Sequence, residues 1–318
     1  MKAEGYDVIG DVHGMGSKLI ELLEHMGYTN DEGHFVHPIR KAIFIGDFID
    51  RGPEQLLAIE TAKAMVEAGS ALAVMGNHEF NAIAFHTPNP SRPGEYLRVR
   101  SDRNRGQSQV FLDAVGEDSD KHDEVIAWFQ SLPMWLEVDG LRVIHACWDE
   151  SSMAKLPDGA SLTRDALIAA TTRGTDEFAA IEILLKGPEI PIDPPYHDKD
   201  GIHREDARFA WWSHATELGE AIEVPARSTV HVDGACPSTD GELWELANPS
   251  QYVERPVAPY PTDASPLLFG HYWRSGSPEH VEAPNAACTD YSAVKGGHLV
   301  AYRWSGEQVL DPARFAWV

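Results

Sequence analysis

The sequence predicts an α/β fold, because short apolar runs alternate with helical patterns through the first third of the chain. Residues 6–10 form the first apolar run, and residues 17–28 then place leucines at helical spacing. A second apolar run at 41–46, a helical pattern that begins near Pro53, and a third run at 71–76 repeat this order. Strands separated by helices of this length usually form parallel pairs. We therefore expect a largely parallel sheet here.

The remainder of the chain mixes helical and strand patterns. Residues 122–132 form an amphipathic pattern that stops before Pro133, and residues 134–147 contain two β-rich runs around Asp139-Gly140, which predicts a hairpin. The further predictions are helices at 163–173 and 175–186, a long surface loop or lid at 187–206, and two closing strands within 266–273 and 296–304.

The chain carries no internal repeat, and we find no clear linker between domains. The composition is ordinary for a globular protein, with 43% hydrophobic and 24% charged residues. We therefore expect one elaborated domain over residues 1–318, with a helical or loop-like cap inserted at about 150–260. A cap in that position would cover whatever site the strand ends of the sheet create.

The charge limits the class of partner. The 318 residues include 50 acidic and 26 basic ones, which gives a net charge of −24. Such a field repels long polyanions, so broad binding to nucleic acid is not expected. The chain has no apolar run long enough for a membrane span and no apolar signal segment before Asp11. Its three cysteines are scattered, so we expect a cytoplasmic protein.

Five apolar runs end in residues that can bind a metal. In open α/β sheets, ligands bind at the carboxyl ends of the strands, where these side chains would gather. Each residue type alone is common in turns and helix caps, but all of them in this order indicate one site. The residues that follow the five runs are Asp11 and His13, Asp47 with Asp50 and Arg51, Asn77 and His78, His145, and His271.

The donor types indicate the kind of metal. Carboxylate, amide and imidazole groups without thiolates suit Mn²⁺, Fe or Zn²⁺. An aspartate can bridge two ions about 3.5–4 Å apart, which is the spacing of two-metal hydrolytic sites. The sequence therefore predicts two divalent ions, with Mn²⁺ as the expected one and Fe or Zn²⁺ as alternatives.

Three blocks carry a family resemblance. "GDVHG", "GDFIDRG" and "GNHE" resemble the signature blocks of the calcineurin-like metallophosphoesterases. The resemblance is to the phosphoprotein-phosphatase branch and its bacterial relatives, which include symmetrical dinucleoside tetraphosphatases and serine/threonine protein phosphatases. It covers about residues 7–80, extends thinly through His145 and "FGHYW", and leaves 150–260 unmatched. It implies two stacked mixed β-sheets flanked by helices.

The resemblance also implies roles for individual residues. Asp11, His13 and His271 would hold one metal, Asn77 and His145 the other, and Asp47 would bridge the two. His78 would protonate the leaving group and Asp50 would orient its imidazole. Arg51 would bind phosphate oxygens, and a metal-bridging hydroxide would attack phosphorus in line.

Some positions stay open in the sequence. Ala146 stands where the branch usually has a glycine, and Cys147 after it is interpreted as a small buried residue rather than a redox group. A second phosphate-binding arginine is usual in that branch, and Arg208 and Arg274 are both compatible with it. Three tryptophans could stack on a nucleobase or belong to the core, namely Trp211, Trp212 and Trp273.

The predicted function is that of a dinuclear-metal phosphohydrolase that acts on a phosphate ester or anhydride of a small molecule, such as a dinucleoside polyphosphate. The alternative is a serine/threonine protein phosphatase, which needs an open groove for a phosphoprotein. A polynucleotide-end phosphatase ranks third, because the net charge counts against it. A metal-binding scaffold without catalysis would have a damaged ligand or acid, and the sequence contains every one of them.

Overall fold

The computed structural model describes residues 3–157, 159–197, 203–215, 221–223, 229–230 and 254–318. Its elements in chain order are β1 (Gly5–Ile9), α1 (Gly16–His25), β2 (Thr29–Asp31), β3 (His34–Val36), β4 (Arg40–Phe44), α2 (Gln55–Glu67), β5 (Ala71–Ala73), α3 (Asn77–His86), α4 (Asp102–Val115), α5 (Asp120–Ser131), β6 (Trp135–Val138), β7 (Leu141–Ile144), α6 (Glu150–Met153), α7 (Arg164–Ala170), α8 (Asp176–Lys186), β8 (Glu189–His197), β9 (His203–Phe209), β10 (Ile222–Glu223), β11 (Thr229–Val230), β12 (Leu267–Phe269), β13 (Ala286–Cys288), β14 (Asp290–Tyr291), β15 (His298–Trp304) and β16 (Phe315–Trp317).

The first sheet contains the strands predicted at the start of the chain. Its order is β14-β15-β1-β4-β5, with β16 paired to β15. β1, β4 and β5 run parallel, and β15 lies antiparallel to β1. The prediction of parallel strands in the first third is therefore confirmed, and the closing strand makes the sheet a mixed one.

The second sheet has the order β13-β12-β7-β6, in which β12 runs parallel to both of its neighbours. The predicted hairpin is confirmed, because β6 and β7 pair antiparallel. Asp139 and Gly140 at its tip both have positive φ, of 50° and 91°. This conformation matches the type I′ turn that an Asp-Gly pair favours.

The two sheets pack against each other and leave their outer faces to helices. Alternate residues of a strand point to opposite faces, so β4 divides its side chains between two cores. Ile43 of β4 is buried with Val143 and Leu268 of the second sheet. Phe44 of β4 is buried on the other side, in the cluster that includes Leu22 of α1. The predicted sandwich of two mixed sheets is confirmed.

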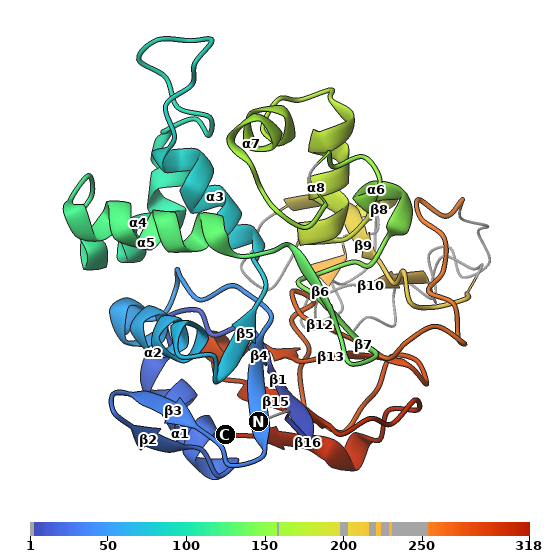
Figure 1. Cartoon of the computed structure of the whole chain (residues 1–318). Coiled ribbons are helices and arrows are strands. Elements are labelled where there is room, and N and C mark those ends of the chain that lie inside the picture. Colours follow the sequence, from blue (N-terminus) through green and yellow to red (C-terminus); the bar gives the residue numbers. More distant parts are fainter. Residues whose placement is uncertain (1–2, 158, 198–202, 216–220, 224–228, 231–253) are drawn as a thin grey trace.

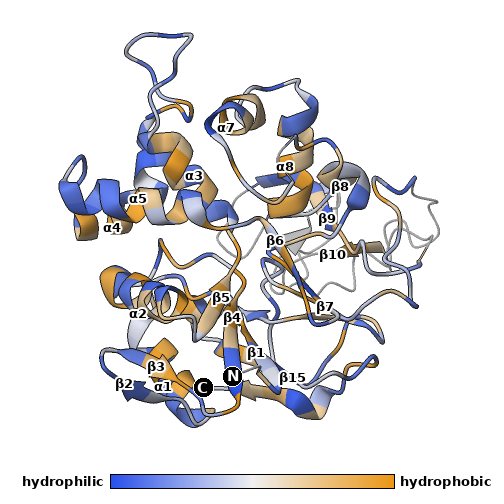
Figure 2. Ribbon diagram, viewed as in Figure 1, coloured by the Kyte–Doolittle hydropathy of each residue, from blue (hydrophilic) through white to orange (hydrophobic). Residues whose placement is uncertain are grey.

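The helices form three groups around the sheets (Figure 1). α1 and α2 pack together beside the β2–β3 hairpin, α3 to α5 form a second group, and α6 to α8 form a third. Figure 2 shows that α4 and α5 contain many hydrophilic residues, with hydrophobic residues between them on the same helices. This pattern is typical of helices that cover a core on one side only.

The sequence predicts a loop over residues 187–206, and this prediction is wrong. β8 and β9 pair antiparallel there, within a small sheet of order β10-β9-β8-β11. Prolines in this segment lack the N–H that a regular ladder requires. The ladder accommodates them with a register shift between Pro191 and Tyr196. The assignment of about 150–260 to an inserted cap stays a prediction.

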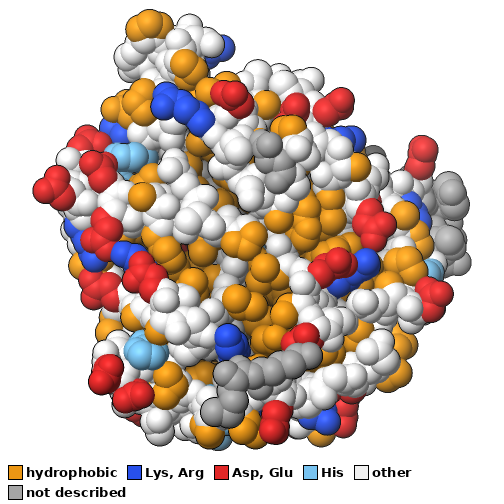
Figure 3. Space-filling model, viewed as in Figure 1, with side chains coloured by type: hydrophobic (Ala, Val, Ile, Leu, Met, Phe, Trp, Pro, Cys, Tyr) orange, Lys and Arg blue, Asp and Glu red, His pale blue; other side chains and the backbone are white. Residues whose placement is uncertain are grey.

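Side chains of different kinds separate on the surface. On the face drawn in Figure 3, hydrophobic side chains gather in the middle, and acidic side chains lie mostly towards the rim. Among the helices within the described ranges, none combines the length and the apolar character that a membrane crossing requires.

Candidate metal centre

The predicted site residues follow directly after five strands. Asp11 and His13 follow β1, Asp47 follows β4, and Asn77 begins α3 just after β5. His145 and His271 follow β7 and β12 of the second sheet. Because the strands within each set run parallel, their carboxyl ends meet along one edge of the sandwich. The structure brings all of these side chains together.

Asp47 lies at the centre of the group. Its Oδ2 is 3.5 Å from Nε2 of His13, and its Oδ1 is 3.5 Å from Nε2 of His145. Burial acts to raise the pKa of this carboxyl group, but the imidazoles of His145, His78 and His13 outweigh burial and hold that pKa below its usual value. The carboxylate is therefore ionised and shared by imidazoles on both of its sides.

The backbone holds Asp47 against the loop that follows β1. The carbonyl of Asp47 accepts the N–H groups of Val12 and His13 at 3.1 and 2.7 Å, and its Oδ1 accepts the N–H of His78 at 3.0 Å. Three segments that are distant in the sequence therefore meet at one residue.

The tautomers of two histidines leave lone pairs facing the cluster. Nδ1 of His13 lies 2.9 Å from the carbonyl of Ile49, and Nδ1 of His145 lies 2.9 Å from the carbonyl of Ile45. A carbonyl only accepts, so each Nδ1 carries the proton and each Nε2 has its lone pair free. A metal-binding histidine has this arrangement, since its other ring nitrogen donates to a carbonyl or carboxylate.

Acceptor atoms then face one another without a proton between them. Nε2 of His145 is 3.0 Å from Oδ1 of Asn77, which itself only accepts. Nε2 of His13 and Oδ2 of Asp11 are both buried without a hydrogen-bond partner, and they lie 4.0 Å apart. Buried polar atoms are normally satisfied, so such a set needs a cation. The residues present therefore fit divalent metal ions.

The charge of the site leads to the same conclusion. Burial, followed by the nearby carboxylates of Asp290 and Asp47, raises the pKa of Asp11 well above its usual value. Burial also lowers the pKa of His13 and of His271 well below the usual range. Carboxylates and neutral imidazoles crowded in this way bind cations well, because a cation stabilises the ionised acid and accepts the imidazole lone pairs.

The side chains form two clusters that share Asp47. One cluster contains His13, Asp47 and His78, and the other contains Asp47, His145 and His271. Nδ1 of His271 is 3.0 Å from Oδ1 of Asn77. The sequence prediction assigned His271 to the metal of Asp11 and His13. The structure instead groups the His271 ring with His145 and Asn77, while its backbone N–H donates to Oδ1 of Asp11 at 3.4 Å.

His78 has a different environment from the other histidines. Its Nδ1 is 2.5 Å from Oδ2 of Asp50, and its Nε2 is 3.4 Å from Nη2 of Arg51. Burial acts to lower the pKa of His78, but the carboxylates of Asp47 and Asp50 raise it above its usual value. An imidazole that keeps its proton in this way can donate it to an oxygen atom.

The site loops carry unusual backbone conformations. Among the described residues, ten other than glycine have positive φ, and five of these are predicted site residues: His13, Asp47, Asp50, Arg51 and His271. This conformation costs L-residues about 1–2 kcal/mol each. Strain concentrated in this way is typical of a functional site that the surrounding structure holds in place.

Glycines allow the loops to approach one another. A Cβ added to Gly76 would lie 2.2 Å from Oδ1 of Asp47, and one added to Gly270 would lie 2.4 Å from Oδ1 of Asp11. Neither distance is sterically allowed, so these two positions require glycine. The glycines that flank the sequence blocks are thus explained by close packing around the carboxylates.

Glu79 belongs to the "GNHE" block, and the structure shows a role for it beyond those predicted from the sequence. Its fully buried carboxylate accepts the N–H groups of Asp47, Phe48 and Gly76 at 2.7, 2.8 and 3.0 Å. Burial, and then the charge of Asp47, raises the pKa of Glu79 to about 8. Glu79 is the third residue of α3, three positions after Gly76, whose N–H it accepts. A glutamate at this spacing from the start of a helix was the available signal.

Gln55 and Asp290 also support the site. Gln55 accepts the N–H of Asp50 at 2.8 Å and donates to the carbonyl of Gly52 at 2.6 Å. Asp290 accepts the N–H of Trp273 at 2.8 Å. Nothing in the local sequence marks Asp290, because its partners belong to other segments.

The two candidate arginines differ in position. Nη1 of Arg208 donates to the carbonyl of His271 at 2.7 Å, so β9 brings this guanidinium to the site. Nε of Arg274 donates to Glu282 at 2.8 Å, and the Glu282 side chain is fully buried. An arginine held by a buried carboxylate is not available to a substrate phosphate, so the geometry favours Arg208.

The structure also shows the environment of the three tryptophans and of Cys147. Trp211 and Trp212 are buried in the core, while Trp273 is half-buried beside Arg51. Cys147 is fully buried, and burial raises the pKa of its thiol well above the usual value, so the thiol stays protonated. Cys236 lies outside the described residues.

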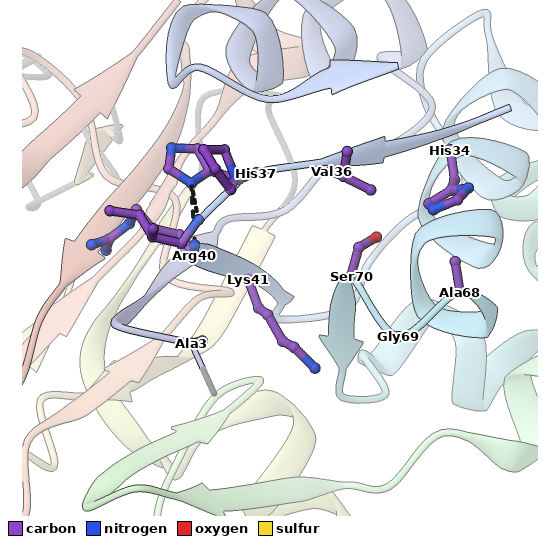
Figure 4. A pocket seen from close by; sticks show the side chains of 11 residues that line it. Ala3, His34, Val36, His37, Arg40, Lys41, Ala68, Gly69 and Ser70 are labelled. Atoms are coloured by element: carbon purple, nitrogen blue, oxygen red, sulfur yellow. Dashed lines mark hydrogen bonds between the residues drawn. The ribbon is translucent and has the colours of Figure 1, made fainter. Parts of the chain in front are cut away.

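Figure 4 shows a separate cavity of about 180 Å³. It is lined by residues from β3, from the start of β4 and from the segment after α2, including His37, Lys41 and Ser70. This is the amino end of the parallel strands, opposite the edge where the acidic residues and histidines gather. None of the predicted site residues lines this cavity.

Two relatives share part of the sequence. The asymmetrical bis(5′-nucleosyl)-tetraphosphatase PrpE of Geobacillus sp. is 45% identical over 73 residues, which are 23% of this chain and 30% of the relative. The enzyme of the same name from Oceanobacillus iheyensis is 30% identical over 141 residues, 44% of this chain and 54% of the relative. The chain thus spans a third to a half of these relatives.

A solved structure of a protein serine/threonine phosphatase from Saccharomyces cerevisiae aligns with a TM-score of 0.48 at 16% identity, and the alignment covers 98% of this chain and 78% of that chain. Residues 6–271 match the family described as calcineurin-like phosphoesterase, and this span contains all the predicted metal ligands. The chain therefore belongs to the calcineurin-like phosphoesterase family.

Proposed function

We propose that this protein is a metal-dependent phosphohydrolase with two divalent ions. The observation that carries the proposal is the position of Asp47 between two clusters of imidazoles whose lone pairs face it. Asp11, His13 and Asp47 would hold one ion, and Asp47, Asn77, His145 and His271 would hold the other. Two ions that share an aspartate are typical of enzymes that hydrolyse phosphate esters and anhydrides.

The ions would supply Lewis acidity, which lowers the pKa of water and neutralises charge on phosphate oxygens. The remaining chemistry belongs to the chain. His78 gives a proton to the leaving oxygen, and Asp50 holds the imidazole through Nδ1. Arg51 and Arg208 bind the phosphate oxygens, which carry the negative charge of the transition state. No serine or cysteine nucleophile is needed.

The proposed substrate is a dinucleoside tetraphosphate. Support comes from the names of the two relatives, both of which are bis(5′-nucleosyl)-tetraphosphatases. Those names also favour asymmetrical over symmetrical cleavage, so that water addition to diadenosine tetraphosphate gives ATP and AMP rather than two ADP. Mn²⁺ is the proposed ion, with Fe or Zn²⁺ as alternatives that the same carboxylate, amide and imidazole donors suit. Location in the cytoplasm stays a prediction.

The test is phosphate or nucleotide release in the presence of Mn²⁺ from a panel of substrates. The panel contains p-nitrophenyl phosphate, bis-p-nitrophenyl phosphate, diadenosine tetraphosphate, a phosphoserine peptide and a phosphorylated DNA end. We expect the highest kcat/KM for the dinucleotide, with ATP and AMP as products. Preference for the peptide would make a protein phosphatase the better assignment. No turnover with two ions bound would favour a non-catalytic scaffold.

A further inference from the structure

Trp273 lies against two arginines at the edge of the site. The guanidinium carbon of Arg51 is 4.1 Å from the centre of the indole, and that of Arg208 is 5.8 Å from the same ring. A guanidinium over an aromatic face at such distances is attracted by the ring quadrupole. The two arginines come from the loop after β4 and from β9, and the indole of Trp273 contacts both of them.

In the part of the chain that the structure describes, no carboxylate holds the Arg51 guanidinium in an ion pair. Among the described residues, Arg51 forms no ion pair within 4.0 Å, although Asp47, Asp290 and Asp11 lie near enough to act on its charge. Its close neighbours are the Trp273 ring and Nε2 of His78 at 3.4 Å. The aromatic face is therefore the main contact that fixes the direction of this guanidinium.

Trp273 is itself held in a strained backbone conformation. Its φ is 52°, a value that side-chain-bearing residues rarely adopt. Oδ2 of Asp290 accepts the N–H of Trp273 at 2.8 Å, and Oδ1 accepts the N–H of Ser292 at 3.0 Å. The carbonyl of Asp290 also accepts the N–H of Arg274 at 2.8 Å. Asp290 thus anchors the turn that presents the indole.

We propose that Trp273 is a positioning residue that orients Arg51 for a substrate phosphate, and that Asp290 holds Trp273 in place. This inference rests on the proposed function, in which Arg51 binds phosphate oxygens. Arg recognises phosphate with two parallel N–H groups, and this geometry is lost if the guanidinium rotates. A guanidinium already held by the indole loses less conformational freedom when phosphate binds.

The experiment compares the wild type with Trp273→Ala and Trp273→Phe. The readouts are the KM and kcat for p-nitrophenyl phosphate and for diadenosine tetraphosphate, and the inhibition constant of inorganic phosphate. We expect Trp273→Ala to raise the inhibition constant and the KM for p-nitrophenyl phosphate by about 5- to 30-fold. Trp273→Phe keeps an aromatic face and should restore most of the affinity.

A double-mutant cycle decides whether Trp273 acts through Arg51. In an Arg51→Ala background, Trp273→Ala should change the inhibition constant of phosphate by less than about twofold, because Arg51, the guanidinium closer to the indole, is gone. Arg208 lies farther from the ring, at 5.8 Å, and the carbonyl of His271 holds it independently. An effect as large as in the wild-type background would overturn the inference. An effect on the dinucleotide alone would also overturn it and would identify Trp273 as a stacking surface for a nucleobase.

Two controls separate the possible failures. Bound metal, measured by mass spectrometry, should stay at wild-type level in the Trp273 variants, which shows that nearby His271 is still in place. The second control is Tyr96→Leu, in the segment before α4. The guanidinium carbon of Arg100 lies 3.4 Å from the centre of the Tyr96 ring, so this variant removes an aromatic partner from a different arginine. It should change neither the inhibition constant of phosphate nor the KM. If the wild type hydrolyses none of the substrates, the proposed function fails. If the wild type is active and Trp273→Ala behaves like it, only this inference fails.

Discussion

Nδ1 of His78 lies 2.5 Å from Oδ2 of Asp50, and the two residues stand 28 positions apart in the chain. Asp50 has a φ of 68° and its N–H donates to Gln55, so the carboxylate is held in place before any substrate binds. With Nδ1 engaged, only Nε2 of His78 is directed to a reacting group. The pair therefore has the form of a general acid and its orienting carboxylate.

Replacement of His78 should harm poor leaving groups most. We expect His78→Ala to lower kcat for an alkyl phosphate by about 10²- to 10⁴-fold, because an alkoxide must be protonated as it leaves. The loss for p-nitrophenyl phosphate should be much smaller, since nitrophenolate leaves without a proton. The measurement is kcat across esters that differ in leaving-group pKa. Equal losses for all esters would show that His78 is not the acid.

Removal of Asp47 should release the metal ions. Asp47→Ala takes away the carboxylate shared by both clusters, so we expect fewer than one tightly bound ion per chain, measured by mass spectrometry after dialysis. Retention of two ions would contradict the bridging role.

The matched control for Asp47 lies in a third cluster, which contains His86, Asp118 and His122. There, Nδ1 of His122 accepts the backbone N–H of Asp118. Nη2 of Arg100 lies 3.6 Å from the carboxylate of Asp118. Nε2 of His86 lies 2.9 Å from Asp123, outside this cluster, so His86→Ala should keep the wild-type metal content.

Replacement of Glu79 should destabilise the fold. Glu79→Ala leaves three buried N–H groups without an acceptor, and each such group costs about 1–3 kcal/mol. We expect the free energy of unfolding to fall by about 3–5 kcal/mol, measured by urea denaturation of the metal-free protein. Glu67→Ala, at an exposed carboxylate of α2, should change it by less than about 0.5 kcal/mol. A similar small change for Glu79→Ala would mean that water replaces its carboxylate.

Two glycine substitutions should have opposite effects. Gly76→Ala places a Cβ 2.2 Å from Oδ1 of Asp47, so it should displace the carboxylate and reduce both bound metal and kcat by more than about tenfold. Gly106→Ala lies within α4, where no atom stands within 4 Å of the added Cβ. It should raise the free energy of unfolding by about 0.5–1 kcal/mol, measured by thermal melting. If Gly76→Ala leaves bound metal and kcat unchanged, the loop can move enough to accommodate the added Cβ.

Local patterns in the sequence were sufficient for the strands and their terminal residues. The apolar run before Asp11, the run before Asp47 and the Asp-Gly turn at 139–140 each specify their structure within a few residues. The prolines of 187–206 were misleading, because a register shift with β9 allows strands that proline content alone argues against. Whether a segment pairs as a strand depends on its partner strand, which its own local sequence does not specify.

The sequence by itself determined which residues stand at the strand ends, and therefore the chemistry of the donors. Only the tertiary structure decided how those donors are shared. It set the ring of His271 beside Asn77, 194 positions away, brought Arg208 to the carbonyl of His271, and paired Arg274 with Glu282. It also placed Trp273 against Arg51. The physical reason is that a strand and the residue after it are fixed by short-range sterics and burial, whereas these contacts depend on how two sheets and the β8–β9 pair pack together.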